Sequence, residues 1–192
     1  METEIKFRIA DLGSLTRKLR AAGFDEQTPR TFEQNSLYDF PDSRLRRSGE
    51  ILRIRRYGDR WTITHKSKGS TSRYKQREEL ESAVLNGETV GQMLQSLGMR
   101  VSFRYEKFRN EWSDGRGHVV LDETPMGNFG ELEGEPEWID EVARKLNIGE
   151  SEYITKSYGE LFADWKRQTG SPAEHMIFPS GAANHPAGGP SK

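Results

Sequence analysis

The chain has 192 residues, of which 29 are basic and 30 acidic, and it contains no cysteine. That length allows one domain with appendages. The formal net charge of −1 provides no overall field that would recruit nucleic acid or an anionic membrane. Without cysteine there are no disulfides, thiolate nucleophiles or zinc–thiolate clusters. No apolar run reaches the roughly 18 residues of a membrane span, and the first residues, Met1-Glu2-Thr3-Glu4, lack the basic-then-apolar order of a signal peptide, so we expect a cytoplasmic protein.

The pattern of apolar residues predicts one domain followed by a tail. Regular periodicity runs from Met1 to about Thr169, and no internal linker divides this body. The remaining stretch, Gly170 to Lys192, is rich in Gly, Pro, Ala and Ser and has no periodicity. Such a stretch cannot bury enough apolar surface to order itself. We therefore predict a domain over residues 1–169 and a disordered tail over residues 170–192.

Alternation of apolar and polar residues dominates the body. In the first segment Ile5, Phe7 and Ile9 fall on one face, whereas Glu4 and Lys6 fall on the other, which is typical of a strand with one charged side. Turn signals such as Gly58-Asp59 and Asp114-Gly115 separate the later segments. The alternation predicts about eight strands, the first over residues 2–9 and the others over residues 31–39, 50–57, 60–68, 73–82, 101–112, 117–123 and 129–135.

Helical spacing appears between these strands. Amphipathic patterns over residues 12–23, 90–98 and 136–146, and around Leu161–Trp165, predict about four helices. Short connections between successive strands favour antiparallel pairing, and eight such strands can close into a barrel. The predicted fold class is therefore α+β: an eight-stranded antiparallel β-barrel flanked by about four helices.

Most of the predicted strands place charges two residues apart on the face opposite their apolar side, as Arg53 and Arg55 oppose Leu52 and Ile54. Any one such face is typical of the solvated side of a half-buried sheet. The cations, however, pair on some strands and the carboxylates on others, and the helices also need apolar surface to cover. If the apolar faces point outward beneath the helices, the charged faces line the lumen of an inside-out barrel.

A lumen lined by charges must be wet and must hold a ligand, because unpaired ions in a dry core lose solvation that only good partners restore. Carboxylates on neighbouring strands supply hard oxygen ligands that suit Mg²⁺ or Mn²⁺. Arginine and lysine in the same cavity suit a polyanion. Cations together with metal-binding carboxylates are what phosphoryl chemistry requires. A small-molecule substrate with about three to four negative charges matches this lumen.

Several short motifs carry these charges. The chain begins with ExExK, written by Glu2, Glu4 and Lys6. Seven further motifs follow in order: Arg53-Ile54-Arg55, Thr64-His65-Lys66, Arg77-Glu78-Glu79-Leu80-Glu81, Glu106-Lys107-Phe108-Arg109, Leu121-Asp122, Gly130-Glu131-Leu132-Glu133 and Lys156-Ser157-Tyr158. Over roughly residues 1–168 the chain thereby resembles the CYTH superfamily, the triphosphate tunnel metalloenzymes that include class IV adenylate cyclases and thiamine triphosphatases.

The resemblance implies a tunnel in which carboxylates hold a divalent metal, Mg²⁺ or Mn²⁺, and cations clamp a triphosphate. The implied metal ligands are Glu2, Glu4, Asp122, Glu131 and Glu133, with Glu79 and Glu81 as further acidic positions. The implied clamp is Arg53, Arg55, Lys66, Lys107 and Arg109, with Arg77 and Lys156 as supporting cations. Lys6 resembles the residue that orients the substrate or transfers a proton during catalysis.

The resemblance leaves the reaction open. In a cyclase of this family the ribose hydroxyl of ATP attacks the α-phosphorus, which gives cyclic AMP and pyrophosphate. In a hydrolase, water attacks the terminal phosphorus of an inorganic, thiamine or nucleoside triphosphate. We favour the cyclase because of the family likeness. Whether the chain forms a homodimer is left open by the sequence. A non-catalytic polyphosphate or nucleotide sensor is less consistent with the full carboxylate set, and an RNA-binding barrel is disfavoured by the near-zero net charge.

Other residues are interpreted as structural. Arg44-Leu45-Arg46-Arg47 follows Pro41-Asp42 and is predicted to be a solvated loop. Tyr158 and Trp165 sit at helical spacing, which favours core packing. His65 falls on an apolar strand face, and no histidine pair has metal-ligand spacing.

Overall fold

A computed structural model describes residues 2–71 and 73–179, with only the backbone described for Glu2 and Thr71. In these residues ten strands form one antiparallel sheet, in the order β5-β6-β1-β10-β9-β8-β2-β3-β4-β7. The strands are β1 (Glu2–Ile9), β2 (Asp25–Asp39), β3 (Ile51–Tyr57), β4 (Arg60–Lys66), β5 (Ser70–Thr71), β6 (Lys75–Arg77), β7 (Glu79–Val84), β8 (Arg100–Ser113), β9 (His118–Thr124) and β10 (Gly127–Glu133).

One chain segment closes the sheet into a barrel. Strand β7 stands at one end of the strand order and β6 next to the other end, yet only Glu78 separates them in the chain. The first half of the segment pairs with β1 and the second half with β4. The strand predicted over residues 73–82 is this segment, interrupted where it passes from one neighbour to the other. When this segment is counted once and the two-residue edge strand β5, which pairs only with β6, is set aside, eight strand segments surround the lumen, and the predicted eight-stranded barrel is confirmed.

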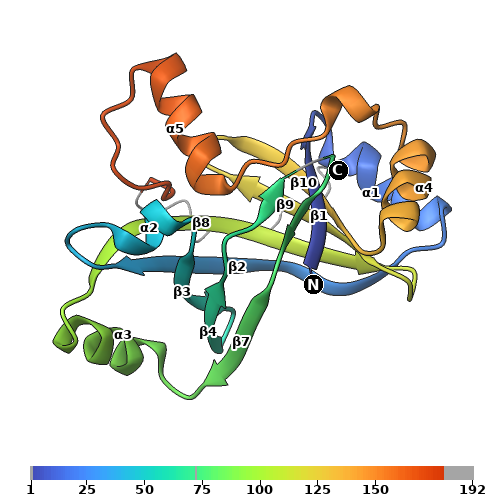
Figure 1. Cartoon of the computed structure of the whole chain (residues 1–192). Helices are drawn as coiled ribbons and strands as arrows, with labels where there is room; N and C mark the ends of the chain where they lie inside the picture. The colour runs from blue at the N-terminus through green and yellow to red at the C-terminus, as the bar shows by residue number, and fades with distance from the viewer. Residues whose placement is uncertain (1, 72, 180–192) are drawn as a thin grey trace.

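Strands β2 and β8 are the longest and form the most extensive pair (Figure 1). Strand β2 begins at Asp25, six residues before the predicted start. The register between the two strands shifts between Thr28 and Thr31. Pro29 lies inside this interval, and because proline has no backbone N–H it cannot complete a sheet ladder. The irregularity around Pro29 is the reason why alternation alone did not reveal the first part of the strand.

The apolar strand faces point outward beneath helices, as predicted for an inside-out barrel. Helices α1 (Leu12–Ala21) and α4 (Pro136–Leu146) lie beside each other over the outer face of β1, β9 and β10 (Figure 1). The Asp11 carboxylate accepts a hydrogen bond from Ser14 N and caps α1, and Pro136 opens α4. The buried residues of this cluster include Ile5, Leu19, Leu132, Trp138, Ile139 and Val142.

Two further helices cover other parts of the outer face. Helix α3 (Gly87–Ser96) packs over β3 and β4, where Gly91 allows close approach, since a Cβ there would lie 2.3 Å from the Tyr38 hydroxyl oxygen. Helix α5 (Tyr158–Thr169) follows a short 3₁₀ turn (Glu150–Glu152) and begins at a capping box made by Ser157 and Glu160. None of the described helices has the length and apolarity that crossing a membrane requires.

The predicted loop over Arg44–Arg47 is instead part of a short helix, α2 (Arg44–Ser48). The buried Asp39 carboxylate at the end of β2 accepts hydrogen bonds from the backbone N–H groups of Leu45 and Arg46 at 3.0 Å each. The helix ends at Gly49, which has a φ of 81°. A cap supplied from six residues upstream leaves no signal inside the segment itself, so the loop prediction was wrong.

The start of the predicted disordered tail is ordered in the structure. Met176 forms a parallel bridge with Tyr105, in which Met176 N donates to Arg104 O and Glu106 N donates to Met176 O. The Met176 side chain is fully buried beside Phe162 and Tyr158. Residues 171–179 are therefore attached to β8, beyond the end of β9, by a single β-bridge. The expectation of a disordered tail fails for these residues, and residues 180–192 lie outside the described part of the chain.

We expect deletion of residues 171–192 to lower the melting temperature by about 5 °C. The reason is that full burial of one methionine side chain stabilises a protein by about 1.5–3 kcal/mol. Deletion of residues 180–192 alone is the matched control and should leave the melting temperature within about 1 °C of the full-length value. Differential scanning calorimetry measures both. Equal melting temperatures for the two truncated proteins would contradict a stabilising role for residues 171–179.

Candidate functional site

The barrel encloses a cavity of about 630 Å³ that is lined by alternate residues of the strands and by the first turn of α5. Alternation places side chains two apart on the same strand face, so the lining follows directly from the strand assignments. Twelve of the fifteen predicted site residues line this cavity: Glu4, Lys6, Arg53, Arg55, Lys66, Arg77, Glu79, Glu81, Lys107, Arg109, Glu131 and Glu133.

The other three predicted residues lie elsewhere or are not described. The Lys156 side chain is 54% exposed, does not line the cavity, and pairs with Asp164 of α5 at 2.6 Å. Its placement in the clamp is therefore wrong, because Ser157 begins the helix and Lys156 remains on the outside. Asp122 is fully buried behind the cavity wall rather than on it. The side chain of Glu2 lies outside the described residues.

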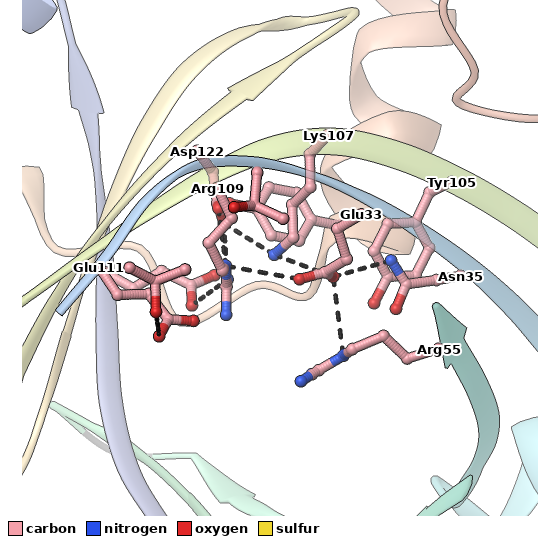
Figure 2. A network of polar contacts seen from close by, with 12 residues as sticks. Glu33, Asn35, Arg55, Tyr105, Lys107, Arg109, Glu111 and Asp122 are labelled. Carbon is pink, nitrogen blue, oxygen red and sulfur yellow. Dashed lines mark hydrogen bonds and ion pairs between the residues drawn. The ribbon is translucent and has the colours of Figure 1, made fainter. Parts of the chain in front are cut away.

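A chain of ion pairs runs around the wall across seven neighbouring strands. Glu33 of β2 contacts Arg55 of β3 and also Lys107 and Arg109 of β8 (Figure 2). Asp122 of β9 accepts hydrogen bonds from both β8 cations at 2.7–2.8 Å. Arg109 then reaches Glu131 of β10. The chain of ion pairs ends with three contacts, Lys6 with Glu131, Lys6 with Glu4, and Lys75 of β6 with Glu4.

Two carboxylates converge at the β1–β10 end of this chain. Lys6 Nζ lies 3.0 Å from Glu4 Oε1 and 3.4 Å from Glu131 Oε1. Burial alone would raise the pKa of Glu4, but the ammonium groups of Lys6 and Lys75 outweigh it and lower the pKa to about 2. Burial would likewise lower the pKa of Lys6, yet Glu131 and Glu4 raise it above its ordinary value. Glu4 and Lys6 are therefore both charged at neutral pH.

The other predicted carboxylates occupy a different wall. Glu79 and Glu81 of β7 lie beside Arg53, whose Nη2 is 3.7 Å from Glu79 Oε1 and 3.5 Å from Glu81 Oε2. Lys66 of β4 forms an ion pair with Glu79. These two glutamates thus balance the charge of the cations on β3 and β4. The contacts in the structure do not join them to Glu4 and Glu131 in one metal site.

Four buried guanidinium nitrogens have no hydrogen-bond partner among the described residues. They are Arg53 Nε, Arg55 Nε, and Nε and Nη1 of Arg77. All three arginines line the cavity from β3 and β6. Leaving a buried donor unsatisfied costs about 1–3 kcal/mol, and more when the donor belongs to a charged group. The cavity wall therefore contains unsatisfied donors on three cations.

The carboxylates at the β1–β10 end fit a divalent cation that also binds substrate. Among the side chains that the structure describes, no group of three acidic, histidine or cysteine residues is arranged to hold a metal ion. Mg²⁺, however, is usually bound through one or two carboxylates together with substrate phosphates. Glu4 and Glu131 supply two carboxylates that meet at Lys6 Nζ. A metal at this end would take its remaining ligands from the substrate or from water.

Sequence reasoning missed three residues of the site. Glu33 is fully buried and contacts three cations, and Lys75 binds Glu4 with a 2.7 Å hydrogen bond. Tyr158, interpreted as core packing, lines the cavity and donates its hydroxyl hydrogen to Asp122 Oδ2 at 2.7 Å. Alternation could have found Lys75, which lies two residues before Arg77. Glu33 offered no comparable signal, because its face of β2 also carries Thr31, Asn35 and Leu37.

Comparison with known proteins supports the fold and identifies relatives. A family model described as the CYTH domain matches residues 1–158. The protein named putative adenylate cyclase MJ0240 from Methanocaldococcus jannaschii is 26% identical over 172 residues, which cover 84% of this chain and 98% of that protein.

Two solved structures share this fold at lower identity. The crystal structure of a putative adenylate cyclase from Vibrio parahaemolyticus superposes with a TM-score of 0.77 at 18% identity, covering 84% of this chain and 97% of that one. The adenylyl cyclase homologue HpAC1 from Hippeastrum superposes with a TM-score of 0.62 at 20% identity, covering 85% of this chain and 96% of that one. Because the family model spans most of the chain and the barrel places the family's charged motifs around one cavity, this protein belongs to the CYTH family.

Proposed function

We propose that the protein binds an organic triphosphate in the barrel and, with a divalent metal, catalyses substitution at phosphorus. The observation that carries this proposal is the set of unsatisfied buried donors on Arg53, Arg55 and Arg77. Phosphate oxygens satisfy guanidinium donors, often two at a time, and such charge-assisted bonds are among the strongest in proteins. An anion with several phosphoryl groups would reach all three arginines at once.

The charge balance of the cavity supports a metal as part of the bound complex. In the described residues eight lysines and arginines line the cavity: Lys6, Arg53, Arg55, Lys66, Lys75, Arg77, Lys107 and Arg109. Six glutamates line it as well, and Glu33 and Asp122 lie directly behind, which makes eight carboxylates. A triphosphate with three to four negative charges would therefore leave the site strongly negative. A divalent cation such as Mg²⁺ or Mn²⁺ at Glu4 and Glu131 would offset two of these negative charges.

The shape of the cavity supports an organic substituent on the phosphate chain. Leu37, Ile51 and Phe103 line the cavity at one end of the barrel, where Leu37 is paired in register with Phe103. Glu4, Glu131 and Glu133 line it from β1 and β10. Inorganic tripolyphosphate would gain nothing from an apolar wall, whereas a planar base or thiamine ring would bury apolar area there. This end thus favours a nucleoside or thiamine triphosphate over the inorganic compound.

We favour the cyclase reaction for this site. In it the ribose 3′-oxygen forms a bond to the α-phosphorus, the bond to the bridging oxygen breaks, pyrophosphate leaves, and the hydroxyl proton is lost. Arg53, Arg55 and Arg77 would bind and orient the phosphate chain, and Lys6, held charged by two carboxylates, would orient it rather than donate a proton. A bound metal would neutralise charge on the phosphate oxygens. The Methanocaldococcus jannaschii relative carries a cyclase name, which supports this assignment.

The second candidate is hydrolysis of the same organic triphosphate with release of orthophosphate. The same clamp would serve it, because both reactions require a bound triphosphate and neutralised charge. The HpAC1 structure is described as revealing a dominant triphosphatase activity in a protein named as a cyclase. HpAC1 is only 20% identical to this chain. Its description joins a cyclase name with a triphosphatase activity on this fold, and so it does not decide which of the two reactions this chain catalyses.

The first experiment separates these reactions by their products. We expect the purified protein with Mn²⁺ to convert ATP to cyclic AMP and pyrophosphate, and to turn over tripolyphosphate more slowly because that compound leaves the apolar wall empty. Chromatography of reactions with ATP, thiamine triphosphate and tripolyphosphate measures the products. Orthophosphate release without cyclic AMP would select the hydrolase. No turnover of any triphosphate with Mg²⁺ or Mn²⁺ would contradict both reactions.

The clamp is tested by a pair of variants. Arg55→Ala should raise KM for the turned-over triphosphate by about 10- to 100-fold, because it removes charge-assisted hydrogen bonds worth about 1.5–3 kcal/mol. Lys156→Ala removes the same charge from the outside of the molecule and should leave KM within about twofold of the wild-type value. Steady-state kinetics measures both. Equal changes in KM for the two variants would contradict the placement of Arg55 in the triphosphate clamp.

The metal end is tested by binding rather than by activity. Glu4→Gln should weaken Mn²⁺ binding at least about tenfold, since it replaces an anionic ligand by a neutral one. Glu79→Gln removes a carboxylate that pairs with Arg53 and Lys66 instead of Lys6, and it should retain near wild-type affinity. Electron paramagnetic resonance of free Mn²⁺ measures the affinity, and circular dichroism checks folding. Stronger loss in Glu79→Gln than in Glu4→Gln would move the metal to the β7 wall.

A further inference from the structure

We infer that Glu33 is a positioning residue of the triphosphate site: it sets the directions of Arg55, Lys107 and Arg109 without touching the substrate. This inference rests on the proposed function, because the arrangement matters for catalysis only if the cavity binds a polyanion. Glu33 is fully buried, and it is absent from the residues that line the cavity. The three cations surround Glu33 in Figure 2, and all three line the cavity.

Strand register brings Glu33 to the centre of these cations. Strand β2 lies between β3 and β8 in the sheet. Glu33 is paired in register with Lys107 on β8, and the neighbouring same-face position, Asn35, is paired with Arg55 on β3. Asn35 Nδ2 donates to Glu33 Oε1 at 2.8 Å and fixes the carboxylate. In the described residues Glu33 makes the one ion pair found for Arg55, and so links β3 to the chain of ion pairs on β8.

The contact distances show how Glu33 acts. Its oxygens lie 3.7 Å from Arg55 Nε, 3.6 Å from Lys107 Nζ and 3.7 Å from Arg109 Nε. These distances allow strong Coulomb attraction in a buried site but exceed hydrogen-bond range. Arg55 Nε consequently keeps its donor without a hydrogen-bond partner. Glu33 therefore attracts these cations without accepting a hydrogen bond from any of them.

Asp122 provides the contrast. It accepts hydrogen bonds at 2.7–2.8 Å from Lys107 Nζ, Arg109 Nε and Arg109 Nη2, and so occupies donors of these groups. Arg55 has no such partner, and its direction depends on Glu33. Without the Glu33 charge, Lys107 and Arg109 would stay bound to Asp122, and their repulsion would turn Arg55 away from them. The clamp would then lose its geometry although all of its cations remain.

A positioning role for Glu33 and a simple charge effect predict opposite changes in polyanion affinity. Glu33→Gln retains the size and the amide contact with Asn35 but removes one negative charge. If charge alone mattered, the more positive cavity would bind a polyanion more tightly. If Glu33 positions the cations, affinity should fall about tenfold. Isothermal titration calorimetry with an imido-bridged, hydrolysis-resistant tripolyphosphate and Mg²⁺ measures this affinity. The control is Glu123→Gln, which removes an equal charge outside the cavity and should bind like the wild type.

A second variant and a second readout cover the case in which Glu33→Gln is unstable. Glu33→Asp keeps the charge and shortens the side chain, so it should recover part of the lost affinity. In the ligand-free protein, the ¹H–¹⁵N resonance of Arg55 Nε should shift and broaden in Glu33→Gln and remain unchanged in Glu123→Gln. This resonance is independent of substrate, because it reports how the guanidinium is held.

The outcomes separate the inference from the proposed function. If the wild type fails to bind the triphosphate analogue, the proposed function fails, and the Arg55 resonance still decides whether Glu33 positions that side chain. If the wild type binds and Glu33→Gln binds equally or more tightly, the inference is overturned while the proposed function stands. Weaker binding together with a shifted Arg55 resonance supports both. An unchanged resonance overturns the inference whatever the affinity.

Discussion

The structure depends on balancing buried charge inside a barrel whose apolar surface faces outward. Each cation of the wall would be costly to bury alone, so the strands interleave lysines and arginines with carboxylates from their neighbours. The chain of ion pairs from Arg55 to Lys75 follows the strand order, which means that any slip in register would separate partners and leave buried charges unpaired. The same contacts that hold the site together therefore also specify the pairing of the sheet.

The helices remove the outward apolar faces of the barrel from water. An ordinary barrel would turn these faces inward. Residues of β1, β9 and β10 such as Ile5, Leu121 and Leu132 alternate with cavity residues and pack beneath α1 and α4. Helix α5 covers another face and also inserts Tyr158 into the wall, where its hydroxyl binds Asp122. Tyr158 thereby joins the outer core to the charged interior, with Lys107 Nζ 4.9 Å from the centre of its ring.

Much of this architecture could be predicted from alternation alone, because period-two patterns identify both strands and the side chains that share a face. The residues that line the cavity from β1, β3, β8 and β10 follow from that parity. What failed depended on contacts between distant segments. Glu33 shows its role only after β2 is paired with β8, and Met176 is a single apolar residue in a Gly- and Pro-rich stretch. Lys156 sits in a family motif, but the start of α5 places it outside.

The segment of residues 171–179 has a practical consequence for anyone who modifies the molecule. Its bridge at Met176 bonds to the backbone of Arg104 and Glu106, and those residues flank Tyr105, whose hydroxyl accepts a 3.4 Å hydrogen bond from Arg53. An affinity tag or fluorescent reporter joined upstream of residue 179 would displace this segment and disturb the inner wall from behind. Fusion junctions are best placed after that point.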